Sequence, residues 1–585
     1  MLENIGKIIE VNKSNILIET NYKDNLLNHY LKINNNIIVE VINRKDNILI
    51  TKLLGEITNN SFSYGVLVLP NLDSTVSIPN EVDLKVILAN VNYFEDKDLI
   101  LGKNPVYNKE VTININSFFQ NHFAIFGSTG SGKSCGVARI IQNLYSKSKK
   151  VAYNSNLFIF DTFGEYTPVL KNISNLNPYL SFKHYTTDPS EINNNILSIP
   201  PWLLGIDELA ILLNATNPSQ LLILEKALKY VNIFKRDDDN SNKYKNDVLA
   251  RCIIDILLSG KPSIQIRDQV FSILSFFKTN DLSLETIIPS PGYNRALKHC
   301  LLIDKDGKMQ EMQLLIDFFS KYLIDKVELT LPTNLKYDLN DLEDALEFAL
   351  IDEGVFKSEK VYDELNILKV RLHSLNNSSD SMFFKYDQFV TRENYIIDLI
   401  KNSNNNNKCQ IIHFNISYVN DRLAKTIVKI ISKMLFDYSK FKSSRTSVPF
   451  HIILEEAHRY VQNDNDVNLL GYKIFERIAK EGRKYGVLLG LISQRPDEIS
   501  TTVVSQCNNF LIFKMNHPKD LEYIKQLVPN ITDDEINDLR ILKPGSCIGF
   551  GTSFKFPSIV KIDLPSPTPL SNNVNISKEW FITIN

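Results

Sequence analysis

One stretch constrains the fold of this chain more than any other: Gly127-Ser128-Thr129-Gly130-Ser131-Gly132-Lys133-Ser134. It fits the P-loop pattern, with Gly at the first and sixth positions, then Lys, then Ser. Glycines let backbone N–H groups turn inward around phosphates, the lysine reaches the β- and γ-phosphates, and the hydroxyl can bind Mg²⁺. We therefore expect ATP to bind at Gly127–Ser134 and the adjoining Cys135, with Lys133 as a catalytic residue and Ser134 as a metal ligand.

The residues on both sides of this loop support the same interpretation. Residues 122–126 form a short apolar run that predicts a buried strand. Apolar residues then recur at helical spacing, at Val137, Ile140, Ile141 and Leu144. The phosphates would therefore lie at a helix N-terminus, where unpaired N–H groups and the helix dipole favour anions.

Composition excludes several classes of protein. The chain has 65 basic and 67 acidic residues, so it lacks the charge signature of a passive nucleic-acid coat. Its six cysteines form no CxxC pairs, which argues against a zinc site or a disulfide framework and favours the cytoplasm. We expect no membrane insertion, because no apolar run approaches the roughly 20 residues that span a bilayer, and the N-terminus lacks a signal-peptide core.

The N-terminal part of the chain predicts short strands separated by turn residues, which is typical of a small β-barrel or sandwich. The length of 585 residues predicts more than one domain. We expect strands at residues 15–19, 37–41, 47–50, 64–68 and 84–88.

Two further regions follow the N-terminal one. Residues 185–407 show mostly helical periodicity. Apolar runs that predict strands of a mainly parallel sheet lie on both sides of this section, at residues 157–160, 410–414, 451–454, 487–492, 510–513 and 547–550. We therefore predict a domain at 1–110, an α/β P-loop core at 111–184 and 408–563, a helical insertion at 185–407, and a C-terminal arm at 564–585.

Two acids follow the apolar run that ends at Leu454. A P-loop enzyme needs one group that holds Mg²⁺ and another that activates water. We assign Glu455 to the metal and Glu456 to the water. The alternative is a solvated pair of acids at the end of a strand.

Asp161 and Glu165 follow another predicted strand. In parallel α/β sheets the carboxyl ends of the strands face the ligand, so either acid could lie near the γ-phosphate. The alternative is an acid that only caps a helix or a turn.

Three more residues are candidates for catalysis. Gln494 ends a predicted strand and is placed to sense the γ-phosphate by a hydrogen bond. Arg483, or second Arg477, could stabilise transition-state charge from a neighbouring subunit. The alternative for both arginines is a basic, solvated helix face.

Together these segments resemble the HerA family of hexameric DNA-translocating ATPases, close to the FtsK group. The resemblance rests on segments 122–134, 161–166, 455–458, 481–486 and 493–496, in that order. It implies a RecA-like core, an N-terminal β-barrel and a helical insertion. Lys480 departs from the Arg that the family pattern leads us to expect.

The resemblance also implies a homo-hexameric ring that hydrolyses ATP with Mg²⁺ and moves along duplex DNA. Members of the family work with a NurA-like nuclease in DNA end processing, or with a sirtuin-like or nuclease effector in anti-phage defence. Two other functions stay open: an ATP-ordered ring that acts as a scaffold for an effector enzyme, and a soluble ATPase of conjugation or secretion.

Overall fold

The structure is a computed structural model of the whole chain. It describes residues 4–12, 15–34, 36–88, 98–146, 150–191, 195–236, 238–289, 292, 294–324, 335–352, 359–402, 407–442, 448–462, 470–528, 531–570 and 576–580.

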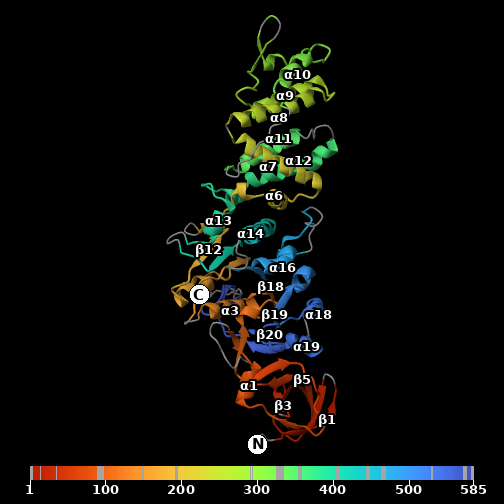
Figure 1. Cartoon of the computed structure of the whole chain (residues 1–585), viewed down its shortest axis with the longest axis vertical. Helices are drawn as coiled ribbons and strands as arrows, with labels where there is room; N and C mark the ends of the chain where they lie inside the picture. Colours follow the sequence, from red (N-terminus) through yellow and green to blue (C-terminus); the bar gives the residue numbers. More distant parts are fainter. Residues whose placement is uncertain are drawn as a thin grey trace. The chain divides into compact units, whose positions relative to one another are not determined.

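The chain forms two compact units, and each is described by itself. The first unit comprises residues 1–196, 396–464 and 473–585, and the second comprises residues 197–395 and 465–472. The first unit contains a β-barrel and the P-loop core, and the second is mainly helical (Figure 1). The domain boundaries expected from the sequence stay predictions.

The N-terminal region is an antiparallel barrel. Its strands follow the order β2-β1-β7-β3-β4-β5, and pairing of β2 with β5 closes the ring, while β6 adds to β5. The side chains of β2 alternate between partly exposed and buried, because only one face of the strand meets the core. The elements are β1 (Gly6–Val11), β2 (Asn15–Thr20), β3 (Tyr30–Ile33), β4 (Ile37–Lys45), β5 (Ile48–Thr58), β6 (Ser61–Tyr64), β7 (Thr75–Ser77) and helix α1 (Glu81–Leu88).

Two of the strands expected in this region are wrong. Residues 84–88 belong to helix α1, which starts at a reciprocal cap: Asp83 N donates to Asn80 Oδ1, and Asn80 N donates to Asp83 Oδ2. Strand β6 ends at Tyr64, and Leu67 beyond it is 95% exposed. A short apolar run therefore did not separate strand from helix or loop here.

A second sheet forms the centre of the P-loop core. Its order is β13-β12-β16-β11-β17-β18-β10-β19-β20-β21-β8-β9 among the described residues. The pairs from β13 to β19 are parallel, and those from β19 to β9 are antiparallel. The mainly parallel sheet expected for the core is confirmed. In its antiparallel extension the strand at 547–550 was predicted, but the antiparallel pairing and strands β21, β8 and β9 were not.

The strands of this sheet are β8 (Asp98–Lys103), β9 (Glu110–Asn114), β10 (His122–Phe126), β11 (Leu157–Asp161), β12 (Phe182–Thr186), β13 (Asn195–Ile196), β16 (Ile411–Asn415), β17 (Phe450–Leu454), β18 (Val487–Ser493), β19 (Cys507–Phe513), β20 (Ser546–Gly551) and β21 (Ser558–Lys561).

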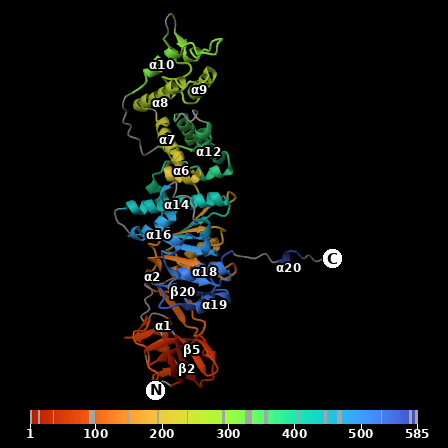
Figure 2. The same ribbon diagram turned by 90° about the vertical axis from the view of Figure 1, so that its right-hand side faces the viewer.

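Helices cover the central sheet, which explains its continuous apolar strands. Every residue of β10, β11, β16, β17 and β18 is buried. Helix α3 packs against β10, and helices α14 and α16 both pack against β18. Helices α14 and α16 also pack against each other (Figures 1 and 2). The helices of this unit are α2 (Ile115–Phe119), α3 (Lys133–Tyr145), α4 (Thr167–Lys171), α5 (Ile173–Leu176), α14 (Asp421–Phe441), η5 (Ala457–Arg459), α16 (Ile474–Tyr485), η6 (Pro496–Glu498), α17 (Thr501–Val504), α18 (Pro518–Leu527), α19 (Asp533–Ile541) and α20 (Ile576–Glu579).

The second unit confirms the expected helical insertion. Three of its helices pack together, with α7 against α11 and α12 against both. Its elements are η1 (Pro201–Leu203), α6 (Ile206–Leu212), α7 (Pro218–Phe234), α8 (Asp239–Leu257), α9 (Ser263–Phe276), β14 (Ile287–Ile288), β15 (Arg295–Ala296), η2 (Leu297–His299), α10 (Met312–Ser320), α11 (Leu339–Asp352), α12 (Glu359–Asn376) and η4 (Ser379–Phe384), with α13 (Arg392–Ile400) leading back to the first unit.

The C-terminal segment returns to the P-loop helix. Gln142 Nε2 donates to Ser566 O over 2.9 Å, and Leu570 N donates to Glu165 O over 2.9 Å. Residues 571–575 and 581–585 of the expected arm lie outside the described residues. None of the described helices has the length and apolarity needed to cross a membrane.

Candidate nucleotide-binding site

The P-loop joins β10 to α3 at the carboxyl edge of the central sheet. Its backbone is fixed at both sides, since Gly127 N donates to Ser493 O and Ser128 N donates to Lys514 O. The first N–H groups of α3 have no acceptor within the helix, so they can bind an anion. The loop expected from the sequence therefore has the shape of a phosphate cradle.

Two glycines give the loop this shape. Gly130 and Gly132 have φ values of +74° and +89°, a region that favours glycine. A Cβ atom on Gly132 would lie 2.5 Å from Gly545 N, because the turn before β20 packs directly on the loop. A Cβ atom on Gly130 would meet no heavy atom within 4 Å.

Lys133 meets Glu456 in this site. Lys133 Nζ lies 3.4 Å from Glu456 Oε1, and both side chains are buried. His458 Nδ1 lies 3.2 Å from Glu456 Oε2 and 3.0 Å from Ser493 Oγ. Burial raises the pKa of Glu456, but His458 and Lys133 outweigh it, so its pKa lies below the ordinary value and the carboxylate is ionised.

Glu455 lies deeper and has the opposite tendency. It is 2% exposed, and its Oε2 accepts a hydrogen bond from Thr162 N. Burial, followed by the charge of Asp161, raises the pKa of Glu455 well above its ordinary value. A divalent cation bound at this carboxylate would favour its ionised form, as expected for a metal ligand.

Glu165 is half-buried beside Ser134, which hydrogen bonds to it. Burial raises the pKa of Glu165. The charge of Lys133 lowers this pKa, whereas the charge of Glu456 raises it. Glu165 therefore lies at the phosphate end of the site, whereas the carboxylate of Asp161 accepts backbone N–H groups of the turn that follows it.

Gln494 connects the P-loop with the acids. Its Oε1 accepts a hydrogen bond from Thr129 Oγ1 over 2.6 Å, and its backbone N–H donates to Glu456. A γ-phosphate bound beside Thr129 would be within reach of this amide.

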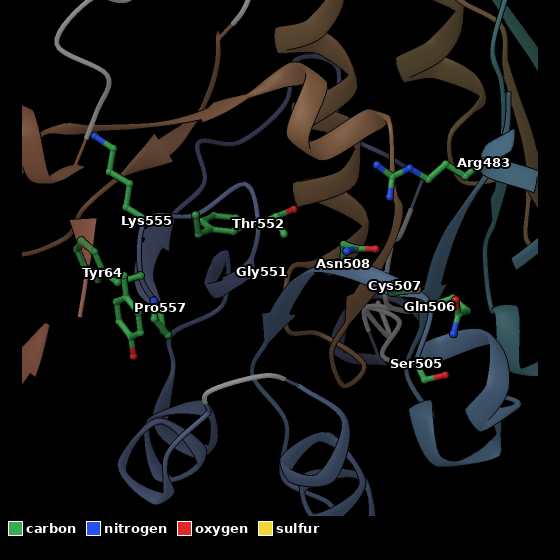
Figure 3. Close-up of a pocket in the computed structure, with 12 residues that line it drawn as sticks. Tyr64, Arg483, Ser505, Gln506, Cys507, Asn508, Gly551, Thr552, Lys555 and Pro557 are labelled. Carbon is green, nitrogen blue, oxygen red and sulfur yellow. The ribbon is translucent and has the colours of Figure 1, made fainter. Parts of the chain in front are cut away.

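The two candidate arginines lie elsewhere. Arg483 lines a cavity of about 660 Å³ together with Asn508 and Thr552 (Figure 3). It also lies near His122 at the start of β10, whereas the P-loop follows the end of that strand. Arg477 lies over the Phe436 ring, 5.7 Å from its centroid. The structure does not bring either arginine to the P-loop of the same chain.

The site fits a nucleotide with Mg²⁺. Ser131 Oγ is buried without a hydrogen-bond partner among the described residues, so a polar group remains available inside the cradle. Magnesium in such sites takes one or two protein oxygens, with waters and phosphates completing its shell. Ser134 and Glu455 can supply these oxygens.

Sequence patterns missed three residues that support this site. His413 contacts Asp161, and Thr162 contacts Glu455. Ser493 contacts His458. A histidine within the apolar run at 410–414 was the only local signal for the first of these.

Comparison with known proteins agrees with this geometry. Residues 101–288 match the family described as "Helicase HerA, central domain". A DNA double-strand break repair helicase HerA of Saccharolobus solfataricus is 24% identical over 584 residues, covering 98% of this chain and 88% of that protein. A probable helicase of Methanocaldococcus jannaschii is 25% identical over 526 residues, covering 89% of this chain and 81% of that protein.

A search of solved structures finds VirB4 of Thermoanaerobacter pseudethanolicus, with a TM-score of 0.43 and 14% identity, covering 80% of this chain and 96% of that chain. The sequence relatives extend over most of the chain, and the match to the central domain of helicase HerA includes the P-loop and its turn at Asp161. By sequence, the chain is therefore similar to the HerA family of ATPases.

Proposed function

We propose that the chain is a Mg²⁺-dependent ATPase that moves along duplex DNA as a hexameric ring. One observation carries this proposal: Lys133, Glu456 and Gln494 meet at the P-loop, although they come from three separate parts of the chain. This set provides charge for the phosphates, an ionised base and a polar sensor, which are the parts that phosphoryl transfer requires.

Lys133 and the N-terminal amides of α3 bind the phosphates in this proposal. Ser134 and Glu455 hold Mg²⁺, which neutralises charge on the phosphate oxygens when it is bound. Glu455 is buried and fixed by Thr162 N, so it presents one orientation toward the site.

Glu456 acts on the attacking water. Its carboxylate is ionised and held between Lys133 and His458, so it can orient water and accept its proton. Gln494 senses the γ-phosphate. Glu165, which lies beside Ser134, is a further catalytic residue near the γ-phosphate.

Arg483 completes the site of a neighbouring subunit, with Arg477 as the second choice. Arg483 is exposed and lies near the opposite end of β10 from its own P-loop. No carboxylate in the described part of the chain lies within ion-pairing distance of Arg483, which leaves its charge available to a second copy. A closed ring brings such a surface to the next P-loop at every interface.

Duplex DNA is the proposed track because relatives over most of the chain are named as DNA double-strand break repair helicases. We propose a partner of the nuclease or sirtuin-like effector class, acting in DNA end processing or in defence. All six cysteines are free thiols, which supports work in the cytoplasm.

The test measures ATP turnover with and without linear duplex DNA, on protein whose mass is determined in the same buffer. We expect a hexamer whose turnover rises with duplex DNA and falls again at high salt. A hexamer that ignores DNA but is needed by a partner enzyme would contradict translocation and favour the scaffold.

A further inference from the structure

Asp161 organises the turn that carries Glu165. Its Oδ1 accepts hydrogen bonds from Phe163 N and Glu165 N, each at 3.2 Å, and its Oδ2 accepts one from Tyr166 N at 2.8 Å. The carboxylate is fully buried, so these donors replace water entirely. The position of Glu165 beside Ser134 therefore depends on how Asp161 is held.

A histidine on the next strand holds Asp161. His413 Nε2 lies 2.9 Å from Asp161 Oδ2, and the imidazole is fully buried. Strand register explains this contact, because Ile159 pairs with His413 and Asp161 lies two residues further on the same face. Because a carboxylate only accepts, His413 Nε2 carries the hydrogen.

A second histidine fixes the first. His184 pairs with His413 in the register of β12 and β16, and the two Nδ1 atoms lie 2.8 Å apart. A contact of this length between two ring nitrogens needs one hydrogen between them, so one Nδ1 donates to the other. On its other side, His184 Nε2 lies 3.4 Å from Glu191 Oε2. Burial and then His413 lower the pKa of His184 to about 4, so His184 is neutral near pH 7.

We propose that His413 and His184 form a positioning relay for ATP hydrolysis, in which they fix Asp161 and thereby aim Glu165 at the reacting phosphate. The relay rests on the proposed ATPase function. It connects strand β12, which lies next to the edge strand β13, with the nucleotide site through side chains only. His413 and His184 touch neither phosphate nor metal, so they are positioning residues.

The first variant is His413→Phe, which keeps an aromatic ring but removes the donor to Asp161. We expect kcat for ATP to fall about 10- to 100-fold, because small displacements of a catalytic group have effects of this size. KM for ATP should change little, since the P-loop and Lys133 are untouched. His413→Gln places an amide N–H near the position of Nε2 and should recover most of kcat.

A double-mutant cycle with Glu165→Ala separates positioning from a general structural role. If the relay acts through Glu165, His413→Phe should lower kcat little further in the Glu165→Ala background. Single-turnover measurement keeps the slow variants readable. The matched control is His451→Phe. His451 is another buried histidine, on the neighbouring strand β17, and its Nε2 lies 2.6 Å from Phe119 O. It should keep kcat.

Normal kcat in His413→Phe, or equal losses in the Glu165 and Glu165→Ala backgrounds, would overturn the relay while leaving the ATPase intact. Absence of turnover in the unmodified chain would overturn the proposed function and the relay with it. Should His413→Phe not fold, His184→Phe decides, with a fall of kcat at constant KM expected and an unchanged kcat counting against the relay.

Discussion

At the scale of single residues, the ionised Glu456 is the centre of the proposed site. Its carboxylate contacts Lys133 through one oxygen and His458 through the other. Its backbone has a left-handed φ of +47°. A non-glycine residue in this conformation costs free energy, so the fold must stabilise it by other contacts. Such strain commonly occurs at functional sites.

Glu456→Gln should bind ATP and lose hydrolysis, because the amide keeps the shape of the side chain but cannot accept a proton. We expect turnover to fall at least about 100-fold with nucleotide affinity within a few-fold. Equilibrium binding of a fluorescent ATP analogue and steady-state turnover measure the two effects separately. Lys133→Ala serves as the comparison that should also lose turnover, and loss of binding in Glu456→Gln would move the metal role to this residue.

The two left-handed glycines of the P-loop differ in a way that can be tested. Gly132→Ala adds a methyl group 2.5 Å from Gly545 N, whereas Gly130→Ala adds one that meets nothing within 4 Å. Both substitutions carry the left-handed cost of about 1–2 kcal/mol, but only the first also displaces the turn before β20. Binding of ATP measured by calorimetry should therefore fall much further in Gly132→Ala. Equal losses would show that the close packing does not matter.

Residue identity predicted part of the site and missed another part for physical reasons. Lys133 and the Glu455–Glu456 pair stand next to apolar strands, so local patterns reveal them. His413 acts on Asp161 only because β16 pairs with β11, and no local pattern contains that pairing. The roles assigned to the individual residues stay predictions.

At the scale of elements, long buried strands were predictable and short amphipathic segments were not. The strands at 450–454 and 487–493 are apolar on both faces, so their pattern excludes an exposed helix. Residues 84–88 carry an apolar run that fits either a strand or a helix, and the cap formed by Asn80 and Asp83 decides for the helix.

The contact between barrel strand β4 and helix α19 predicts a pH effect. Burial raises the pKa of Glu40 to about 7, with Glu535 and Asp538 adding to this and Lys52 opposing it. The folded state therefore retains a proton that the unfolded state releases above about pH 4.5, so this group destabilises the fold as pH rises toward 7.

Glu40→Gln should remove this effect. We expect the variant to be more stable than the unmodified chain by about 1–3 kcal/mol near pH 8 and similar to it near pH 5. Thermal unfolding at both pH values measures the difference. An equal shift at both pH values would indicate a packing effect rather than proton release.

At the scale of the whole molecule, the proposed ring requires that one subunit supply Arg483 to another. Mixing Arg483→Ala subunits with Lys133→Ala subunits should restore part of the turnover, because some interfaces then combine an intact P-loop with an intact arginine. The measurement is turnover across a series of mixing ratios. Lys484→Ala, an exposed neighbour on α16, is the matched control and should keep full turnover.

The order of strands in the central sheet has a consequence for how the chain is made. Strand β10 ends at Phe126, but both of its neighbours, β18 and β19, begin only at Val487 and Cys507. At a synthesis rate of roughly 5–20 residues per second, β10 waits on the order of tens of seconds on the ribosome before either neighbour exists. Throughout that interval an apolar strand has both edges unpaired, which makes it the kind of segment that aggregates if it is exposed before the second half of the chain emerges.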